Sequence, residues 1–391
     1  MEERGWSKIL IFCVVVLVFK AGLWRSRELY DQYVFGSRHS ALFVFGDSLA
    51  DAGNNNYLNT SIVARANFPP YGKSFFGTAT GRFSDGRTIF DFLAMRLEVP
   101  FPAPWFQPCL DCDISYGANF ASAGSGLLNS TSQQYRNVVH FGRQVNEFTR
   151  IFHMLETDSG YPAEKLLSSS IIAINIGAND IAGYYMASAS LPRNDSPDEF
   201  IDFLLKDYKN YLLSLHEAGA RKFVIMGISP LGCSPGMRFA GLSRWRGGCD
   251  QTVNKLFQQF NAGLKNLVLY LNKTLRASTL IYVNTYDILM NIINNGRLLG
   301  FSESTSACCG EGPFNAAVGC GQTNLGHKRI EGSVCTDPPQ YVFWDGFHPT
   351  ERAQLMIADQ IWGGDSSSVF PFNMRTLTHA TAPSYVTSYT A

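Results

Sequence analysis

Four short apolar runs, each followed by a loop of small and polar residues, constrain the fold of this 391-residue chain more than any other feature. The runs cover residues 41–45, 171–176, 222–226 and 279–283. Their length and continuous apolar character are typical of strands that are buried on both faces of a sheet. The first run leads into Gly46-Asp47-Ser48, and the second leads into Gly177-Ala178-Asn179-Asp180. Polar groups therefore gather where the predicted strands end.

Amphipathic stretches, with apolar residues at helical spacing, lie between and after these runs. We expect helices over residues 88–97, 198–216, 250–275 and 351–362. Because strands that alternate with helices form parallel sheets covered on both faces, the sequence predicts an α/β fold with a mostly parallel central sheet. Functional sites in such folds lie at the carboxyl ends of the strands.

The charges of the chain balance, with 32 Lys and Arg residues against 32 Asp and Glu residues. This balance argues against a nucleic-acid binder and against a polybasic membrane-surface protein, because both need a basic face. The 46% of hydrophobic residues, together with 29 Phe and 17 Tyr, supply ample apolar surface for a large core. A chain that is mainly disordered is therefore excluded.

The N-terminus carries an apolar run at residues 9–19, preceded by Arg4 and Lys8. This run is shorter than the roughly 20 residues of a membrane-spanning helix, but it suits a signal peptide. We expect residues 1–22 to be a signal peptide, so that the protein is secreted, extracellular and without a stable membrane anchor after cleavage. The alternative is an uncleaved signal anchor extended by residues 21–24, which also directs the rest of the chain into the secretory lumen.

The cysteines and the glycosylation sequons fit an oxidising compartment. Once Cys13 is removed with the signal peptide, eight cysteines remain: Cys109, Cys112, Cys233, Cys249, Cys308, Cys309, Cys320 and Cys335. An even number predicts up to four disulfides, whose pairing the sequence leaves open. Zinc is the weaker interpretation, since Cys109 and Cys112 form one C-x-x-C pair and no second pair follows. Four sequons supply the candidate glycosylation sites Asn59, Asn129, Asn194 and Asn272.

His348 is the candidate general base among the seven histidines. It lies in Asp345-Gly346-Phe347-His348-Pro349, just before a predicted helix. A carboxylate three residues before a histidine in a tight loop can accept a hydrogen bond from one imidazole nitrogen and fix the tautomer of the ring. Such spacings also arise by chance, so the pair alone is weak evidence for catalysis.

Ser48 is the candidate nucleophile. It follows the first predicted strand, at a strand-to-helix turn that would present Oγ above the edge of the sheet and make the Ser48 N–H available to an oxyanion. The alternative makes Asp47 or Ser48 an ordinary helix N-cap. The surrounding residues do not form the G-x-S-x-G motif of the α/β-hydrolases.

Two further loops supply candidate oxyanion donors. Residues 119–126, Asn-Phe-Ala-Ser-Ala-Gly-Ser-Gly, let backbone N–H groups approach a substrate closely. Asn179 follows the second predicted strand with a side-chain amide that can donate to an oxyanion. The alternatives are ordinary turns for the glycines and a helix cap for Asn179 or Asp180.

Together these segments resemble the motif blocks of plant-type GDSL esterases/lipases, within the SGNH-hydrolase superfamily. Phe43-Val-Phe-Gly-Asp-Ser-Leu-Ala-Asp-Ala-Gly-Asn-Asn-Asn56 resembles the first block of that family. Residues 119–124 resemble the second block, residues 177–180 the third and residues 345–348 the fifth. The blocks occur in family order and span nearly the whole mature chain.

The resemblance implies a flavodoxin-like three-layer α/β/α sandwich, the SGNH-hydrolase fold. It implies that Ser48 is the nucleophile, that His348 is the general base and that Asp345 orients His348. It also implies that no metal or cofactor is needed and that the oxyanion hole consists of the Ser48 backbone, Gly124 and Asn179. One departure is Ala123, where many relatives have a second glycine.

The sequence thus predicts a secreted serine carboxylic-ester hydrolase that cleaves lipid or other acyl esters through an acyl-serine intermediate. Since one site draws on both ends of the chain, we expect a single domain over residues 41–365, followed by a tail at residues 366–391 whose last part is loosely ordered. The expected partner is a small-molecule or polymer ester and not a nucleic acid, and the oligomeric state stays open. Two alternatives remain: acyl transfer to a hydroxyl other than water, and a catalytically silent extracellular binding protein on the same scaffold.

Overall fold

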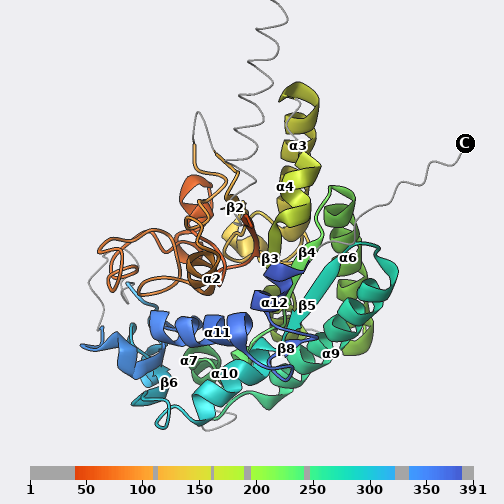
Figure 1. Cartoon of the computed structure of the whole chain (residues 1–391). Helices are drawn as coiled ribbons and strands as arrows, with labels where there is room; N and C mark the ends of the chain where they lie inside the picture. Colours follow the sequence, from red (N-terminus) through yellow and green to blue (C-terminus); the bar gives the residue numbers. More distant parts are fainter. Residues whose placement is uncertain are drawn as a thin grey trace, which may run out of the picture. The chain divides into compact units, whose positions relative to one another are not determined.

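A six-stranded, mostly parallel sheet is at the centre of the part of the chain that the computed structural model describes (Figure 1). The described residues are 40–108, 113–159, 163–188, 195–241, 247–321 and 334–380. The strands are β1 (Leu42–Gly46), β2 (Gly117–Asn119), β3 (Ile171–Asn175), β4 (Lys222–Met226), β5 (Thr279–Val283) and β8 (Val369–Phe370). Their order is β2–β1–β3–β4–β5–β8, with parallel pairing from β2 to β5 and β8 antiparallel to β5. The first five strands thus have the flavodoxin-like order 2-1-3-4-5.

Helices cover both faces of the sheet. The helices are α2 (Ile89–Leu97), α3 (Phe141–Ser159), α4 (Ala163–Ser169), α5 (Ala178–Ser188), α6 (Pro197–Glu217), α7 (Pro235–Ala240), α9 (Gln251–Thr274), α10 (Thr285–Asn294), α11 (Glu351–Gly363) and α12 (Met374–His379). On one face, the rings of Phe43 and Phe45 in β1 contact Phe148 of α3, and α6 packs against both α3 and α9. The other face is covered by α2, α10, α11 and α12. These three layers agree with the predicted α/β/α sandwich.

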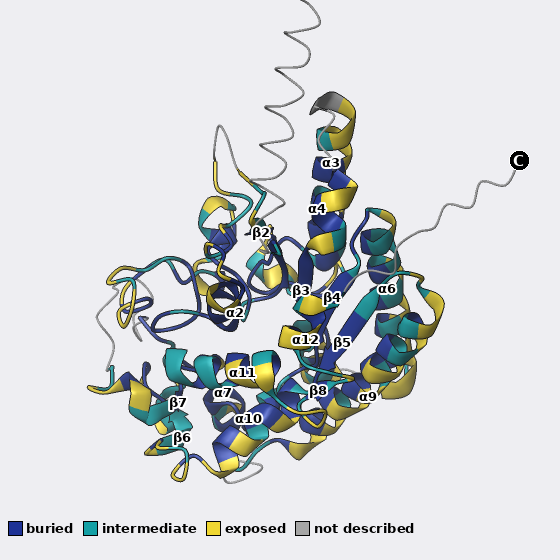
Figure 2. Cartoon of the chain, in the orientation of Figure 1, coloured by how far each residue is buried: buried dark blue, intermediate teal, exposed yellow. Residues whose placement is uncertain are grey.

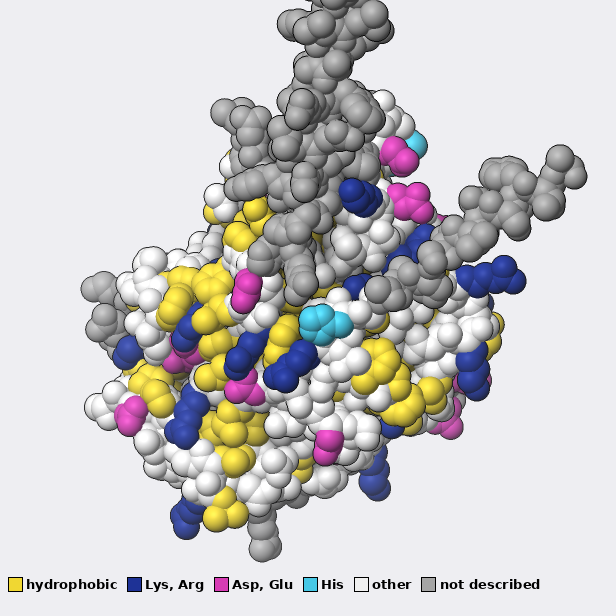
Figure 3. Space-filling model, in the orientation of Figure 1, with side chains coloured by type: hydrophobic (Ala, Val, Ile, Leu, Met, Phe, Trp, Pro, Cys, Tyr) yellow, Lys and Arg dark blue, Asp and Glu magenta, His cyan; other side chains and the backbone are white. Residues whose placement is uncertain are grey.

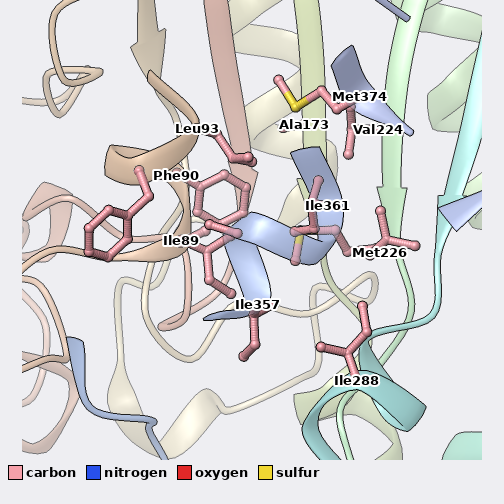
Figure 4. Packing of buried hydrophobic residues seen from close by; sticks show 14 of the residues in the cluster. Ile89, Phe90, Leu93, Ala173, Val224, Met226, Ile288, Ile357, Ile361 and Met374 are labelled. Carbon is pink, nitrogen blue, oxygen red and sulfur yellow. The ribbon is translucent and has the colours of Figure 1, made fainter. Parts of the chain in front are cut away.

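The hydrophobic core on the second face consists of side chains from the central strands and from α2, α10, α11 and α12 (Figure 4). Strand residues there are almost completely buried, as the dark blue strands in Figure 2 also show. The labelled members of this cluster are Ile89, Phe90, Leu93, Ala173, Val224, Met226, Ile288, Ile357, Ile361 and Met374. Because neither face of the sheet is exposed to solvent, its strands appear in the sequence as continuous apolar runs.

The predicted helices begin at side chains that cap them. Ser196 starts α6 with a capping box in which Glu199 is the reciprocal partner. The Asp250 carboxylate accepts two backbone N–H groups of α9, and the Thr350 hydroxyl accepts one of α11. All four predicted helices and all four predicted strands are confirmed, with bounds that differ by no more than two residues.

The Cys-rich segment at residues 301–340 contains regular structure, although its sequence shows no clear periodicity. Its residues Glu303–Ala307 form strand β6, which pairs in parallel with β7 (Tyr341–Phe343). Three disulfides join described cysteines: Cys233 to Cys249, Cys308 to Cys335, and Cys309 to Cys320. The prediction of disulfides is therefore confirmed for three bonds, and Cys109 and Cys112 lie outside the described residues.

The ordered fold continues beyond residue 365, where the sequence predicts the start of a tail. Val369 lies in β8 and extends the edge of the sheet next to Val283 of β5. Met374 and Leu377 of α12 are fully buried in the core cluster. The Ser- and Thr-rich composition hides these few apolar side chains, and burying them holds residues 366–380 against the domain.

No helix among the described residues is long and apolar enough to cross a membrane. The predicted signal peptide at residues 1–22, the sequon at Asn194 and the last part of the predicted tail, residues 381–391, lie outside the described residues. On the face shown in Figure 3, Lys and Arg side chains are interspersed with Asp and Glu side chains. That face therefore presents mixed charge to the solvent.

Candidate active site

The candidate site lies at the carboxyl edge of the sheet, where β1 and β3 end side by side. Strand order reverses here, because β2 lies on one side of β1 and β3 on the other. Open α/β sheets bind their ligands at such switch points. Ser48 follows β1, and Asn179 follows β3.

Ser48 lies in a tight turn, and no α-helix begins directly after it in this described segment. The backbone N–H groups of Ala50 and Asp51 donate to the Asp47 carbonyl at 3.1 and 2.9 Å. The Asp47 carboxylate accepts from the Leu49 N–H at 3.1 Å and closes the turn. The expected strand-to-helix turn and the N-cap alternative are therefore both wrong, since the first regular element after the turn is the 3₁₀ helix η1 (Asn54–Tyr57).

The structure brings Ser48, His348 and Asp345 into one hydrogen-bonded chain. His348 Nε2 lies 2.8 Å from Ser48 Oγ, and His348 Nδ1 lies 2.8 Å from Asp345 Oδ1. Asp345 is 5% exposed and His348 is 8% exposed, whereas Ser48 is half-buried at the surface of the site. A neutral histidine held this way through Nδ1–H presents Nε2 as a proton acceptor to the serine.

The loop that carries Asp345 and His348 is closed on itself. Asp345 Oδ1 accepts the backbone N–H groups of Phe347 and His348, each at 2.9 Å. Burial alone would raise the pKa of Asp345, but the neighbouring His348 and these hydrogen bonds together lower it below its ordinary value. The carboxylate therefore stays ionised and keeps its acceptor role toward the imidazole.

The Cys-rich segment at residues 301–340 is hydrogen-bonded to the chain just before this loop. The Cys308 N–H donates to the Phe343 carbonyl at 2.9 Å, and the Cys309 N–H donates to the Trp344 carbonyl at 2.7 Å. Both cysteines are fully buried and form disulfides. The strand that leads into Asp345 is thus hydrogen-bonded to two cysteines that are themselves held by disulfides.

Tyr71 is a residue of the site that the sequence did not reveal. Its hydroxyl donates to Asp345 Oδ2 at 2.8 Å, and its side chain is buried. Burial and the nearby Asp345 charge hold the pKa of the Tyr71 phenol well above its ordinary value, so the group remains a donor. Tyr71 follows Phe68, Pro69 and Pro70, and nothing in that stretch indicates a partner 274 residues away.

Two backbone N–H groups of the site, those of Ser48 and Gly124, are the candidate oxyanion donors. Among the described residues, neither the Ser48 N–H nor the Gly124 N–H has a hydrogen-bond acceptor. Gly124 is buried and has φ = +82°, and a Cβ there would lie 2.8 Å from a ring carbon of Tyr135. Buried N–H groups without partners are rare, and they mark positions where an anionic oxygen can be bound.

The Asn179 side chain points across the site and not along its own helix. It lies in the first turn of α5, and its Nδ2 donates to the Ser125 carbonyl at 2.9 Å. Nδ2 also lies 3.5 Å from Asp47 Oδ2. The helix-cap alternative for Asn179 is therefore wrong, because its amide links the third motif block to the first block and to the residue that follows the second.

Two buried carboxylates hold the loops of the site in register. Asp51 Oδ2 accepts the Ala123 N–H at 3.0 Å, which ties the first loop to the residue before Gly124. Asp180 accepts the Leu127 N–H at 2.9 Å and the Leu128 N–H at 3.1 Å. The Asp180 carboxylate thus holds the loop at Leu127 and Leu128 against α5 and does not cap its own helix. The roles of Asp51 and Asp180 were not apparent from the sequence.

Asp47 lies under the site between Ser48 and Asn179. Burial raises its pKa from 3.8 to about 7, against the lowering effect of its hydrogen bond with the Leu49 N–H. No group of three or more metal-ligating side chains is present among the described residues.

Comparisons with known proteins agree with the motif blocks. The sequence model of the family described as GDSL-like Lipase/Acylhydrolase matches residues 42–361. GDSL esterase/lipase 5 of Arabidopsis thaliana is 34% identical over 385 residues, which cover 96% of this chain and 97% of that protein. GDSL esterase/lipase 7 of the same plant is 36% identical over 340 residues, which cover 85% of this chain and 90% of that protein.

Similarity to solved structures is weaker. The lipase Lip_vut3 from a goat rumen metagenome has a TM-score of 0.37 and 12% identity, with 82% of this chain and 94% of that chain covered. Family membership rests instead on the match over residues 42–361 and on relatives that align along nearly their whole length. The chain therefore belongs to the GDSL-like lipase/acylhydrolase family of ester hydrolases.

Proposed function

We propose that this family member hydrolyses carboxylic esters with Ser48 as the nucleophile, His348 as the general base and Asp345 as the acid that orients His348. The observation that carries the proposal is the hydrogen-bonded chain from Ser48 Oγ through the imidazole to Asp345, with 2.8 Å at each step. A serine is a weak nucleophile until a base in hydrogen-bond reach takes its proton, and His348 Nε2 is in that position.

The reaction then has two halves. In the first, Ser48 Oγ bonds to the ester carbonyl carbon while its proton passes to His348 Nε2. The tetrahedral intermediate collapses, the bond to the alcohol oxygen breaks, and His348 protonates the leaving alcohol. In the second half, water attacks the acyl-serine and gives a proton to His348, which returns it to Ser48 as the carboxylic acid departs.

Negative charge develops on the carbonyl oxygen in both halves. We assign its binding to the N–H groups of Ser48 and Gly124 and to the Asn179 amide. The two backbone donors are free of other acceptors among the described residues, so they need no rearrangement to receive the oxygen. Asn179 Nδ2 donates to the Ser125 carbonyl at 2.9 Å and to Asp47 Oδ2 at the longer distance of 3.5 Å, so the substrate oxygen would replace the longer of these two bonds.

The test is Ser48→Ala, measured on p-nitrophenyl acetate and with a fluorophosphonate that labels active serines. Loss of the nucleophile should lower kcat by about 10⁴-fold or more and abolish labelling. Ser130→Ala, at an exposed serine, is the matched control and should behave like the unmodified protein. A folded Ser48→Ala protein with near-normal turnover would refute the assignment.

We also propose that the protein is exported through the secretory pathway. Support comes from the three disulfides among the described residues and from the apolar N-terminal run at residues 9–19. Asn59 and Asn129, two of the candidate glycosylation sites, are exposed on the folded domain.

A further inference from the structure

A cavity lies beside the candidate triad, between the loops that follow β3 and β4 and the loop that carries His348. Its walls include the residues on either side of Ser48 and on either side of His348, namely Asp47, Leu49, Phe347 and Pro349. The chain neighbours of both Ser48 and His348 therefore contribute to the walls of this cavity.

The floor of the cavity is apolar and closed. Its walls include Ile176 and Ile228, which follow β3 and β4, together with Leu289 of α10 and Phe343 of β7. All four side chains are less than 5% exposed. Apolar walls of this kind bind hydrocarbon and offer little to a sugar or a charged group.

The mouth of the cavity is bounded by side chains that reach the surface. Leu231, in the 3₁₀ helix η4 (Leu231–Cys233), is half-buried, and Phe347 is 49% exposed. Phe347 is nevertheless held in place: its ring lies so close to Gly236 of α7 that a Cβ on Gly236 would be 2.5 Å from ring carbon Cζ. The Gly236 N–H also donates to the Gly346 carbonyl at 2.7 Å. The position of Phe347 at the rim is thus fixed by its contacts with α7.

The cavity is small, with a volume of about 30 Å³. That volume holds about two water molecules, and so about two or three carbon atoms beyond the carbonyl carbon at Ser48. Each further methylene would have to displace wall side chains that are packed against the core.

Which half of the ester occupies the cavity follows from the order of events. The alcohol must leave after the first half of the reaction, and a water must then reach the acyl carbon from the same side. The acyl group stays on Ser48 through both halves. A cavity with a closed floor suits the group that stays, and the open side suits the group that is exchanged for water.

We propose that this cavity binds the acyl group of the ester and restricts the preferred substrates to esters of short acyl chains, from acetyl to about butyryl. The inference rests on the proposed function, since it takes Ser48 as the acylated residue. It makes Leu231 a specificity-determining residue, because Leu231 limits the cavity at its half-buried rim.

The test compares two series of esters on the purified protein. In the first, p-nitrophenyl acetate, butyrate and hexanoate vary the acyl chain, and in the second, methyl, butyl and hexyl acetate vary the alcohol. We expect kcat/KM to fall at least tenfold from butyrate to hexanoate and to change little along the alcohol series. Leu231→Ala should raise the hexanoate-to-acetate ratio of kcat/KM about tenfold. Leu298→Ala makes the same change at a side chain that is 88% exposed, and it should leave the ratio unchanged.

The outcomes separate this inference from the proposed function. Hexanoate cleaved as well as acetate, a cut-off along the alcohol series, or a ratio unaffected by Leu231→Ala in a folded protein would each overturn the acyl-cavity assignment while fluorophosphonate still labels Ser48. Failure of the unmodified protein to cleave any ester and to react with fluorophosphonate at Ser48 would overturn the proposed function itself.

Discussion

The Tyr71 hydroxyl donates a 2.8 Å hydrogen bond to the Asp345 carboxylate, and this bond joins the first part of the chain to the histidine loop near its end. Asp345 Oδ1 already accepts two backbone N–H groups of its own loop. Tyr71 supplies the donor on the other oxygen, Oδ2. The carboxylate is therefore fixed on both sides, which makes Tyr71 a positioning residue for His348.

Tyr71→Phe removes this donor and keeps the ring. Hydrogen bonds to charged groups contribute about 1.5–3 kcal/mol, so kcat/KM should fall roughly 10- to 100-fold. The loss should appear in kcat more than in KM, because this bond positions the Asp345–His348 pair and does not contact the substrate. Tyr270→Phe, at a half-exposed tyrosine, is the control. Equal kcat in folded Tyr71→Phe and Tyr270→Phe proteins would show that Tyr71 only fills space.

Asn179→Ala separates charge stabilisation from nucleophile activation. Loss of one oxyanion donor costs about 10²–10³ in kcat and should leave KM little changed, because the interaction is made mainly in the transition state. Ser48 and His348 remain paired, so slow fluorophosphonate labelling should persist. Asn210→Ala, at an exposed asparagine, should retain full activity. Unchanged kcat in a folded Asn179→Ala protein would remove this residue from the oxyanion hole.

The raised pKa of Asp47 predicts a stability that depends on pH. Folding shifts this pKa from 3.8 to about 7, so between these values the folded protein binds a proton that the unfolded chain releases. This group therefore stabilises the fold less as pH rises from about 4 to 7, by at most about 1.4 kcal/mol per pH unit.

Asp47→Asn removes the titration, and urea unfolding at several pH values measures it. The free energy of unfolding of the variant relative to the unmodified protein should increase from pH 4 to pH 7 and level off above pH 7. A difference that is constant with pH would contradict the shifted pKa. Ser130→Ala again serves as the control for the measurement.

The three described sequons are not equivalent on the folded surface. Asn59 and Asn129 are exposed, whereas both side-chain atoms of Asn272 bond the Leu280 backbone, at 2.8 and 2.9 Å. A glycan on Asn272 Nδ2 would disturb the contact between α9 and β5. Peptide mapping of the exported protein should find glycans at Asn59 or Asn129 and an unmodified Asn272. Full glycan occupancy at Asn272 in a stable protein would show that these two bonds are dispensable.

Continuous burial made much of the fold predictable. The runs at residues 222–226 and 279–283 match β4 and β5 residue for residue, because buried parallel strands leave no polar interruption. Strand β6, Glu-Ser-Thr-Ser-Ala, was missed since it lies in a small two-stranded sheet and has mostly half-buried polar side chains. Strand β2, Gly-Ala-Asn, is too short to show any period.

The candidate site divides in a similar way. Local motifs located Ser48, Asn179 and the histidine loop, and the structure brings these segments together, while their catalytic roles stay predictions. Tyr71 and Asp51 could not be found, because their partners lie far away in sequence and one residue leaves no periodic trace. Long-range pairing of single polar side chains is decided by the folded backbone and not by local pattern.

Ser48 and His348 are 300 residues apart, and this separation has a consequence for how the protein is made. Synthesis proceeds from the N-terminus, so the serine emerges from the ribosome long before the histidine exists. If Ser48 and His348 act as proposed, a chain that ends before residue 348 holds the nucleophile without its base. On the proposed roles, ester hydrolysis is therefore expected only after the histidine loop has been made and has folded against Ser48.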